Sequence, residues 1–133
     1  TIDGVSYYND SKGTNPDASI KAVQAMKSPT ILIGGGFDKG LAFDDWIASF
    51  NKKVKCLVLM GETREIIANA ARKQGFNNII MVNDLKEAVR VSAQRAEDGD
   101  AVLLSPACAS WGMFDNYEQR GRMFKQYVKE LHE

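Results

Sequence analysis

Five short apolar runs recur along the chain, and amphipathic segments separate them. The runs are rich in Ile, Val, Leu and Tyr, which favour β-strands. Most are continuously apolar rather than alternating, which is typical of strands covered on both faces of a sheet. We expect strands at residues 5–8, 30–33, 56–60, 79–82 and 101–104.

The segments between these runs carry apolar residues at helical spacing. Asn15 and Pro16 indicate a helix start, because asparagine caps free N–H groups and proline suits the first helical position. Asp84 with Glu87 resembles a capping box, and Gly75 suits a helix end. We expect helices over residues 16–26, 43–50, 62–74, 85–96 and 114–131.

Strands that alternate with helices predict an α/β fold. We expect a Rossmann-like, doubly wound, mostly parallel sheet of about five or six strands with helices on both faces. No repeat, low-complexity tract or internal linker divides the sequence, so residues 1–133 form one predicted domain. The opening TIDGVSYYND runs into strand-like sequence without an initiator methionine, and we therefore expect a piece of a longer protein.

Composition narrows the classes of partner. At 133 residues and 44% apolar content, the chain can bury a core. Lysine plus arginine and aspartate plus glutamate balance at 17 each, which argues against a nucleic-acid binder. No apolar run approaches about 18 residues, so no membrane span is expected. Cys56 and Cys108 form no CxxC pair and His132 is the single histidine, so we expect no metal site and a reducing, cytoplasmic setting.

Three segments that follow predicted strands carry candidate chemistry. Open parallel sheets bind ligands outside the carboxyl ends of their strands, so the three segments should lie at one edge. The first, NDSKGTN at residues 9–15, combines a carboxylate, an ammonium, hydroxyls and amides before a helix N-terminus. Asp10 suits a ribose diol, and a helix N-terminus attracts anions. An Asx-rich turn with Asn15 as the helix cap explains the same residues without a ligand.

The second segment, GGGFDKG at residues 34–40, is rich in glycine, which lets the backbone approach another group or take a positive φ. Its GxGxxxG spacing is a loose relative of the dinucleotide fingerprint and is not a P-loop. Lys39 would present a cation suited to a carboxylate or phosphate. A flexible turn with a solvated lysine is the alternative interpretation.

The third segment follows the last predicted strand and reads SPACASWGMF over residues 105–114. Cys108 and Ser110 are candidate nucleophiles, but no histidine lies near them in the sequence to act as a base. We interpret the small residues as a loop whose backbone and hydroxyl groups approach a ligand. Taken alone, the three segments indicate a polar site for an anionic small molecule and define no reaction.

Together the three segments resemble the motifs of the Mur ligases. NDSKGTN is similar to NDSKATN, LIGGGFDKG to a GG-x-D-K/R segment, and LSPACASWGMFDNYEQRG to the LSPACASFDMF-x-x-FE-x-RG motif of the D-glutamate-adding members. The resemblance runs across nearly the whole chain and corresponds to the C-terminal domain of the family. Gly13, Trp111, Gly112 and Tyr117 depart from the motifs.

The resemblance implies an ATP-driven condensation in peptidoglycan synthesis. In the family, the carboxylate of UDP-N-acetylmuramoyl-L-alanine becomes an acyl phosphate, the amine of D-glutamate attacks it, and amide, ADP and phosphate result. Magnesium ions neutralise charge on the phosphates. The P-loop, the magnesium ligands and the UDP-sugar site belong to central and N-terminal domains. We therefore expect this domain to be inactive alone, to close over ATP and D-glutamate within a monomer, and to hold no metal itself.

The resemblance also assigns roles to residues. The implied D-glutamate residues are Thr14, Lys39, Ser110 and Tyr117, and the implied ATP residues are Asp10 and Lys12. Cys108 becomes a small packed residue. Two alternatives stay open: a stand-alone Rossmann-type nucleotide-binding module, in which Glu62 could hold a ribose, and a regulatory or interaction domain with a degenerate site.

Overall fold

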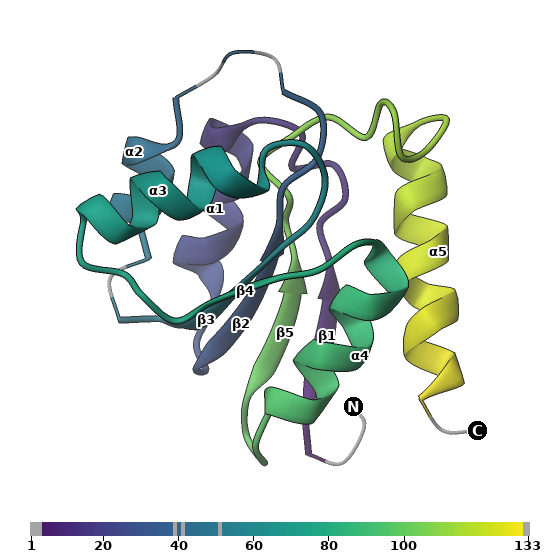
Figure 1. Cartoon of the computed structure of the whole chain (residues 1–133). Helices are drawn as coiled ribbons and strands as arrows, with labels where there is room; N and C mark the ends of the chain where they lie inside the picture. The colour runs from purple at the N-terminus through teal and green to yellow at the C-terminus, as the bar shows by residue number, and fades with distance from the viewer. Residues whose placement is uncertain (1–3, 39, 41, 51, 132–133) are drawn as a thin grey trace.

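The strands of the sheet all run parallel. A computed structural model describes residues 4–38, 40, 42–50 and 52–131. In these ranges the strand order is β1-β5-β2-β3-β4 (Figure 1). The strands are β1 Ser6–Asn9, β2 Thr30–Gly34, β3 Val54–Leu59, β4 Ile79–Met81 and β5 Ala101–Leu104. The helices are α1 Pro16–Ala25, α2 Asp44–Ala48, α3 Arg64–Lys73, α4 Leu85–Arg95 and α5 Tyr117–Glu130.

Helices α1, α2 and α3 cover one face of the sheet, and α4 and α5 cover the other (Figure 1). Right-handed crossovers explain this division. The chain moves in one direction across the sheet from β1 to β4 and then returns to β5, so the returning helix lies on the opposite face. The predicted doubly wound α/β fold is thereby confirmed, with five strands in the part of the chain that the structure describes.

Successive residues of β2, β3 and β5 pack alternately into two separate cores. Leu32 and Leu57 lie in the core beneath α1, α2 and α3, whereas Ile33 and Val58 lie in the core beneath α4 and α5. All four side chains have no exposed surface. Burial on both faces is the reason that these strands are continuously apolar in the sequence.

The caps of the helices follow the predicted residues with two differences. Asn15 Oδ1 accepts the backbone N–H of Ala18 (2.9 Å), as expected for a cap before Pro16. Asp84 Oδ1 accepts the N–H of Glu87 (2.8 Å). The Glu87 carboxylate accepts the N–H of Asn83 (3.2 Å), one residue before the amide that a capping box would use.

The second difference concerns the last helix, which begins at Tyr117 and not at Phe114 as predicted. Asn116 takes the cap position, and its side chain accepts the N–H of Gln119 (2.7 Å). The N–H groups of Met113 and Phe114 instead bond to the carbonyl of Ser110, which makes a turn before the helix. Phe114 still packs against the core beneath α4 and α5, so its apolar character reflects burial in a loop.

β5 lies between β1 and β2 in the sheet. This order creates two topological switch points, which are places where the loops after two adjacent strands leave toward opposite faces of the sheet. The chain leaves β1 and β2 toward α1 and α2 on one face, but it leaves β5 toward α5 on the other. Loops that diverge to opposite faces open a crevice between adjacent strand ends, where open α/β sheets bind ligands. No helix in the described ranges is both long and apolar enough to cross a membrane.

Candidate functional site

Three loops meet at the carboxyl end of β5. We name them the β1–α1 loop (residues 10–15), the β2–α2 loop (35–43) and the β5–α5 loop (105–116). The N–H of Ala107 donates to the carbonyl of Gly13 (2.8 Å), which joins the first loop to the third. The N–H groups of Gly35 and Phe37 donate to the carbonyls of Pro106 (2.9 Å) and Ala109 (3.0 Å), which joins the second to the third. The predicted convergence is confirmed, and the β5–α5 loop is its centre.

A chain of hydrogen bonds orients the Asp10 carboxylate. Asp10 Oδ2 accepts the hydroxyl of Ser105 (2.7 Å), and Ser105 Oγ lies 2.7 Å from Ser19 Oγ. Trp46 Nε1 donates to Ser19 Oγ (2.8 Å) from within the core. Ser19, Ser105 and Trp46 are fully buried, so the half-buried carboxylate rests on a rigid support. The sequence alone does not predict this network, because its members are far apart along the chain.

One departure from the family motif is Gly13, which stands where the motif has alanine. The side chains around Gly13 explain this departure. A Cβ atom at Gly13 would lie 2.8 Å from both Asp10 Oδ2 and Ser105 Oγ. Contacts that short would push the two side chains away, so glycine leaves room for their hydrogen bond. The glycine therefore fits the contact between the β1–α1 and β5–α5 loops.

Replacing Ser105 with alanine should lower the free energy of unfolding by about 1–3 kcal/mol, because a buried network loses its central hydroxyl. Urea denaturation of this 133-residue chain measures the effect. Ser92→Ala is the matched control: the Ser92 hydroxyl is also buried but has no hydrogen-bond partner. Its removal should be neutral or slightly stabilising. Equal destabilisation by the two variants would contradict the role assigned to Ser105.

A cavity of 240 Å³ lies between the β1–α1 loop and the first turns of α5. Lys12 and Tyr117, which are predicted site residues, both line it, and Tyr117 is 38% exposed. Arg122 and Lys125 add two cations against the single carboxylate of Glu118, so the cavity suits an anion. Arg122 and Lys125 could not be predicted as site residues from the sequence, because cations on one helix face are typical of a solvated surface.

Ser110 is buried with 3% of its surface exposed, and Thr14 is half-buried directly after Gly13, whose carbonyl bonds to the β5–α5 loop. Ser110 lies directly before Trp111, which is 54% exposed and packs edge-on against Phe37 at 5.3 Å. Lys39 lies outside the described residues. The structure therefore brings the loops of all the predicted site residues to one edge, whereas the ligand roles of these residues stay predictions.

The glycines of the β2–α2 loop serve contacts between neighbouring strand ends. A Cβ atom at Gly35 would lie 2.1 Å from the carbonyl oxygen of Met60, and one at Gly36 would lie 2.7 Å from that of Ala109. The Glu62 carboxylate accepts the N–H of Asp38 (2.6 Å) in the same loop. A dinucleotide-binding site would need a carboxylate for the ribose. Glu62 instead accepts a hydrogen bond from the protein's own backbone, and this argues against the dinucleotide interpretation.

Cys108 is a packed side chain and not an exposed nucleophile. It is 2% exposed, and its Sγ lies 3.6 Å from Thr63 Oγ1. Burial raises the pKa of the Cys108 thiol to about 11, so the nucleophilic thiolate is scarce at neutral pH. Among the residues described, no group of three or more His, Cys, Asp or Glu side chains could hold a metal ion.

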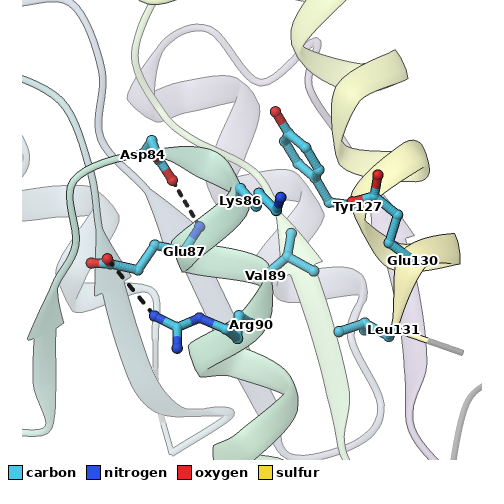
Figure 2. Close-up of a pocket in the computed structure, with 8 residues that line it drawn as sticks. All are labelled: Asp84, Lys86, Glu87, Val89, Arg90, Tyr127, Glu130 and Leu131. Carbon is cyan, nitrogen blue, oxygen red and sulfur yellow. Dashed lines mark hydrogen bonds and ion pairs between the residues drawn. The ribbon is translucent and has the colours of Figure 1, made fainter. Parts of the chain in front are cut away.

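A second cavity, of 370 Å³, lies between α4 and α5 (Figure 2). Figure 2 shows Tyr127 on α5 and Leu131, directly after that helix, opposite Val89 on α4, with charged groups around them. Lys86 and Arg90 stand among three carboxylates, so neither sign of charge dominates. None of the predicted site residues lines this cavity, and the strand-end cavity is the better candidate for an anionic ligand.

The fold, the switch points and the cationic cavity define an α/β domain that suits an anionic small molecule at its strand ends. Residues 1–108 match the family described as "Mur ligase, glutamate ligase domain". The chain belongs to this Mur ligase family, as the motifs of its three loops indicate.

A relative in Lachnoclostridium phytofermentans, UDP-N-acetylmuramoylalanine--D-glutamate ligase, is 61% identical over 128 residues, which cover 96% of this chain. The matched part is 28% of that relative's length. Two solved structures share the fold. A domain from a ligase of Haemophilus ducreyi has a TM-score of 0.63 at 15% identity and covers 98% of this chain and 94% of that one. Folylpolyglutamate synthase of Mycobacterium tuberculosis, complexed with ADP and AMPPCP, has a TM-score of 0.59 at 12% identity, covering 86% and 28%.

Proposed function

We propose that this chain is the C-terminal domain of a ligase that uses ATP to join D-glutamate to UDP-N-acetylmuramoyl-L-alanine in peptidoglycan synthesis. The observation that carries the proposal is the meeting of three motif-bearing loops at the end of β5. The 61% identity to a protein named for D-glutamate addition supports D-glutamate as the amino acid. Folylpolyglutamate synthase, which contains a domain of this fold, is complexed with ADP and AMPPCP, and this agrees with ATP as the nucleotide.

The chemistry of the site fits a dianionic amino acid beside a nucleotide. Asp10, which Ser105 already orients, would accept hydrogen bonds from the ATP ribose, and Lys12 would contact the same nucleotide. Lys39 would pair with a carboxylate of D-glutamate, because charge-assisted hydrogen bonds are stronger than neutral ones. Thr14 and Ser110 would add hydroxyl groups.

The substrate supplies the nucleophile of the proposed reaction. The amine of D-glutamate would attack an acyl phosphate, the C–N bond would form, and phosphate would leave with the bonding electrons of the C–O bond. This domain would bind and orient the amine rather than attack the substrate itself. The packed, protonated Cys108 is consistent with that division.

Other domains of the full-length protein would supply the rest of the active site. They would hold the UDP-sugar and the magnesium ions, and this domain would close over ATP and D-glutamate. We expect a monomer in the cytoplasm, where ATP is available, and weak binding of either ligand to this domain alone.

Phosphate release by the full-length protein tests the proposal. With ATP, magnesium and UDP-N-acetylmuramoyl-L-alanine, release should require D-glutamate and should not occur with L-glutamate or diaminopimelate. The 133-residue chain alone should release none. Turnover that is indifferent to D-glutamate would contradict the proposal, and saturable binding of NAD to the chain would favour the dinucleotide alternative.

A further inference from the structure

Arg120 is a buried cation directly beneath the three loops. Only 1% of its surface is exposed, although burying a charge is unfavourable unless it is well paired. In the described part of the chain it forms no ion pair with a carboxylate. Burial lowers the pKa of Arg120 to about 10, so the side chain stays charged at neutral pH. Ordinary packing does not explain why a charged guanidinium is buried at this position.

The guanidinium joins two loops that are far apart in the sequence. Its Nε donates to Ser11 Oγ (3.0 Å) and its Nη2 to the Ser11 carbonyl (2.7 Å). Its Nη1 donates to the Cys108 carbonyl (3.0 Å). Ser11 Oγ in turn donates to the Tyr117 carbonyl (2.6 Å) on the first turn of α5. One side chain therefore fastens the β1–α1 loop, the β5–α5 loop and α5 together.

The anchored residues are immediate neighbours of the predicted ligand residues. Ser11 lies between Asp10 and Lys12 in the chain, and Cys108 lies two residues before Ser110. The β2–α2 loop packs against the same place, because a Cβ atom at Gly36 would lie 3.7 Å from Arg120 Nη1. A shift of Arg120 would move these neighbours relative to one another.

We propose that Arg120 is a positioning residue for the ligase reaction: its three donors hold the β1–α1 and β5–α5 loops in the arrangement that receives the nucleotide and D-glutamate. The inference rests on the proposed function. An arginine suits the task because its planar fork directs several donors at fixed angles, whereas lysine is a flexible point charge. The buried positive charge also favours an anionic ligand at the switch points.

Kinetics of full-length variants test this role. Arg120→Gln should lower kcat/KM for D-glutamate by about 100-fold, because displacement of binding groups by about 1 Å has an effect of that size. Arg120→Lys keeps the charge and should recover part of the loss. Arg90→Gln is the matched control, since Arg90 is 62% exposed on α4 with a long contact of 3.9 Å to Glu87. It should leave the kinetics unchanged.

Thermal unfolding of each variant separates positioning from stability. A folded Arg120→Gln enzyme with kcat/KM within twofold of the wild type would overturn the inference, whatever its melting temperature. If both Arg120 variants fail to fold, Ser11→Ala decides, because it removes only the hydroxyl that links Arg120 to Tyr117. Reduced kcat/KM in that variant supports the inference, and unchanged kinetics overturns it. A wild-type enzyme without D-glutamate-dependent turnover would instead contradict the proposed function, on which the inference rests.

Discussion

Replacing Lys39 with alanine in the full-length protein should reduce kcat/KM for D-glutamate by about 100-fold or more. Truncating one partner of a desolvated charge pair costs about 2–5 kcal/mol, much of which reflects the partner charge left unpaired. The residues around Lys39 are anchored: Phe37 N–H bonds to Ala109, Asp38 N–H to Glu62, and Gly40 N–H to the Asp38 carboxylate (2.8 Å). The loop should therefore keep its course when the side chain is removed.

Steady-state kinetics with D-glutamate and ATP varied separately check this expectation. The KM for D-glutamate should rise far more than the KM for ATP, because Lys39 is assigned to the amino acid. Lys73→Ala provides the control, since Lys73 is an exposed lysine in the last turn of α3. Unchanged D-glutamate kinetics in Lys39→Ala would show that another group pairs with the amino acid.

Gly35→Ala should destabilise the domain by about 3 kcal/mol or more. Gly35 has a φ of +97°, and its added Cβ would lie 2.1 Å from the Met60 carbonyl oxygen. The left-handed conformation adds about 1–3 kcal/mol of strain for a residue with a side chain. Overpacking adds about 1–3 kcal/mol more, because backbone atoms at the ends of β2 and β3 must separate. Urea denaturation of the 133-residue chain measures the sum.

Gly75→Ala separates the two contributions. Gly75 has a φ of +85° at the end of α3, but nothing lies within 4 Å of an added Cβ. Only the conformational strain of about 1–2 kcal/mol should appear. If Gly35→Ala is no more destabilised than Gly75→Ala, the glycines of the β2–α2 loop are not required by contact with the neighbouring strand end.

Local patterns in the sequence predicted the elements well. The apolar runs marked all five described strands, and the signal was strongest for β2, β3 and β5, which are buried on both faces. Asn15 and Asp84 marked helix starts, because the capping interaction involves residues only three apart. The start of α5 was predicted too early, since Phe114 fits the helical spacing while Asn116 takes the cap.

Contacts between distant parts of the chain could not be predicted in the same way. The insertion of β5 between β1 and β2 decides which loops are neighbours, and it depends on how α4 and α5 pack on the opposite face. Arg120 looks like a surface residue in a polar helix, yet Ser11 and Cys108 bury it. The partnership of Ser105 with Asp10 spans 95 positions and leaves no local signal.

Hydrogen exchange of backbone amides in the full-length protein tests the central claim most directly. The claim is that the loops at the ends of β1, β2 and β5 bind D-glutamate and the nucleotide. With ADP and magnesium present, D-glutamate should slow exchange in the β1–α1, β2–α2 and β5–α5 loops, and L-glutamate should not. Protection that appears instead between α4 and α5, or nowhere in this domain, would contradict the claim.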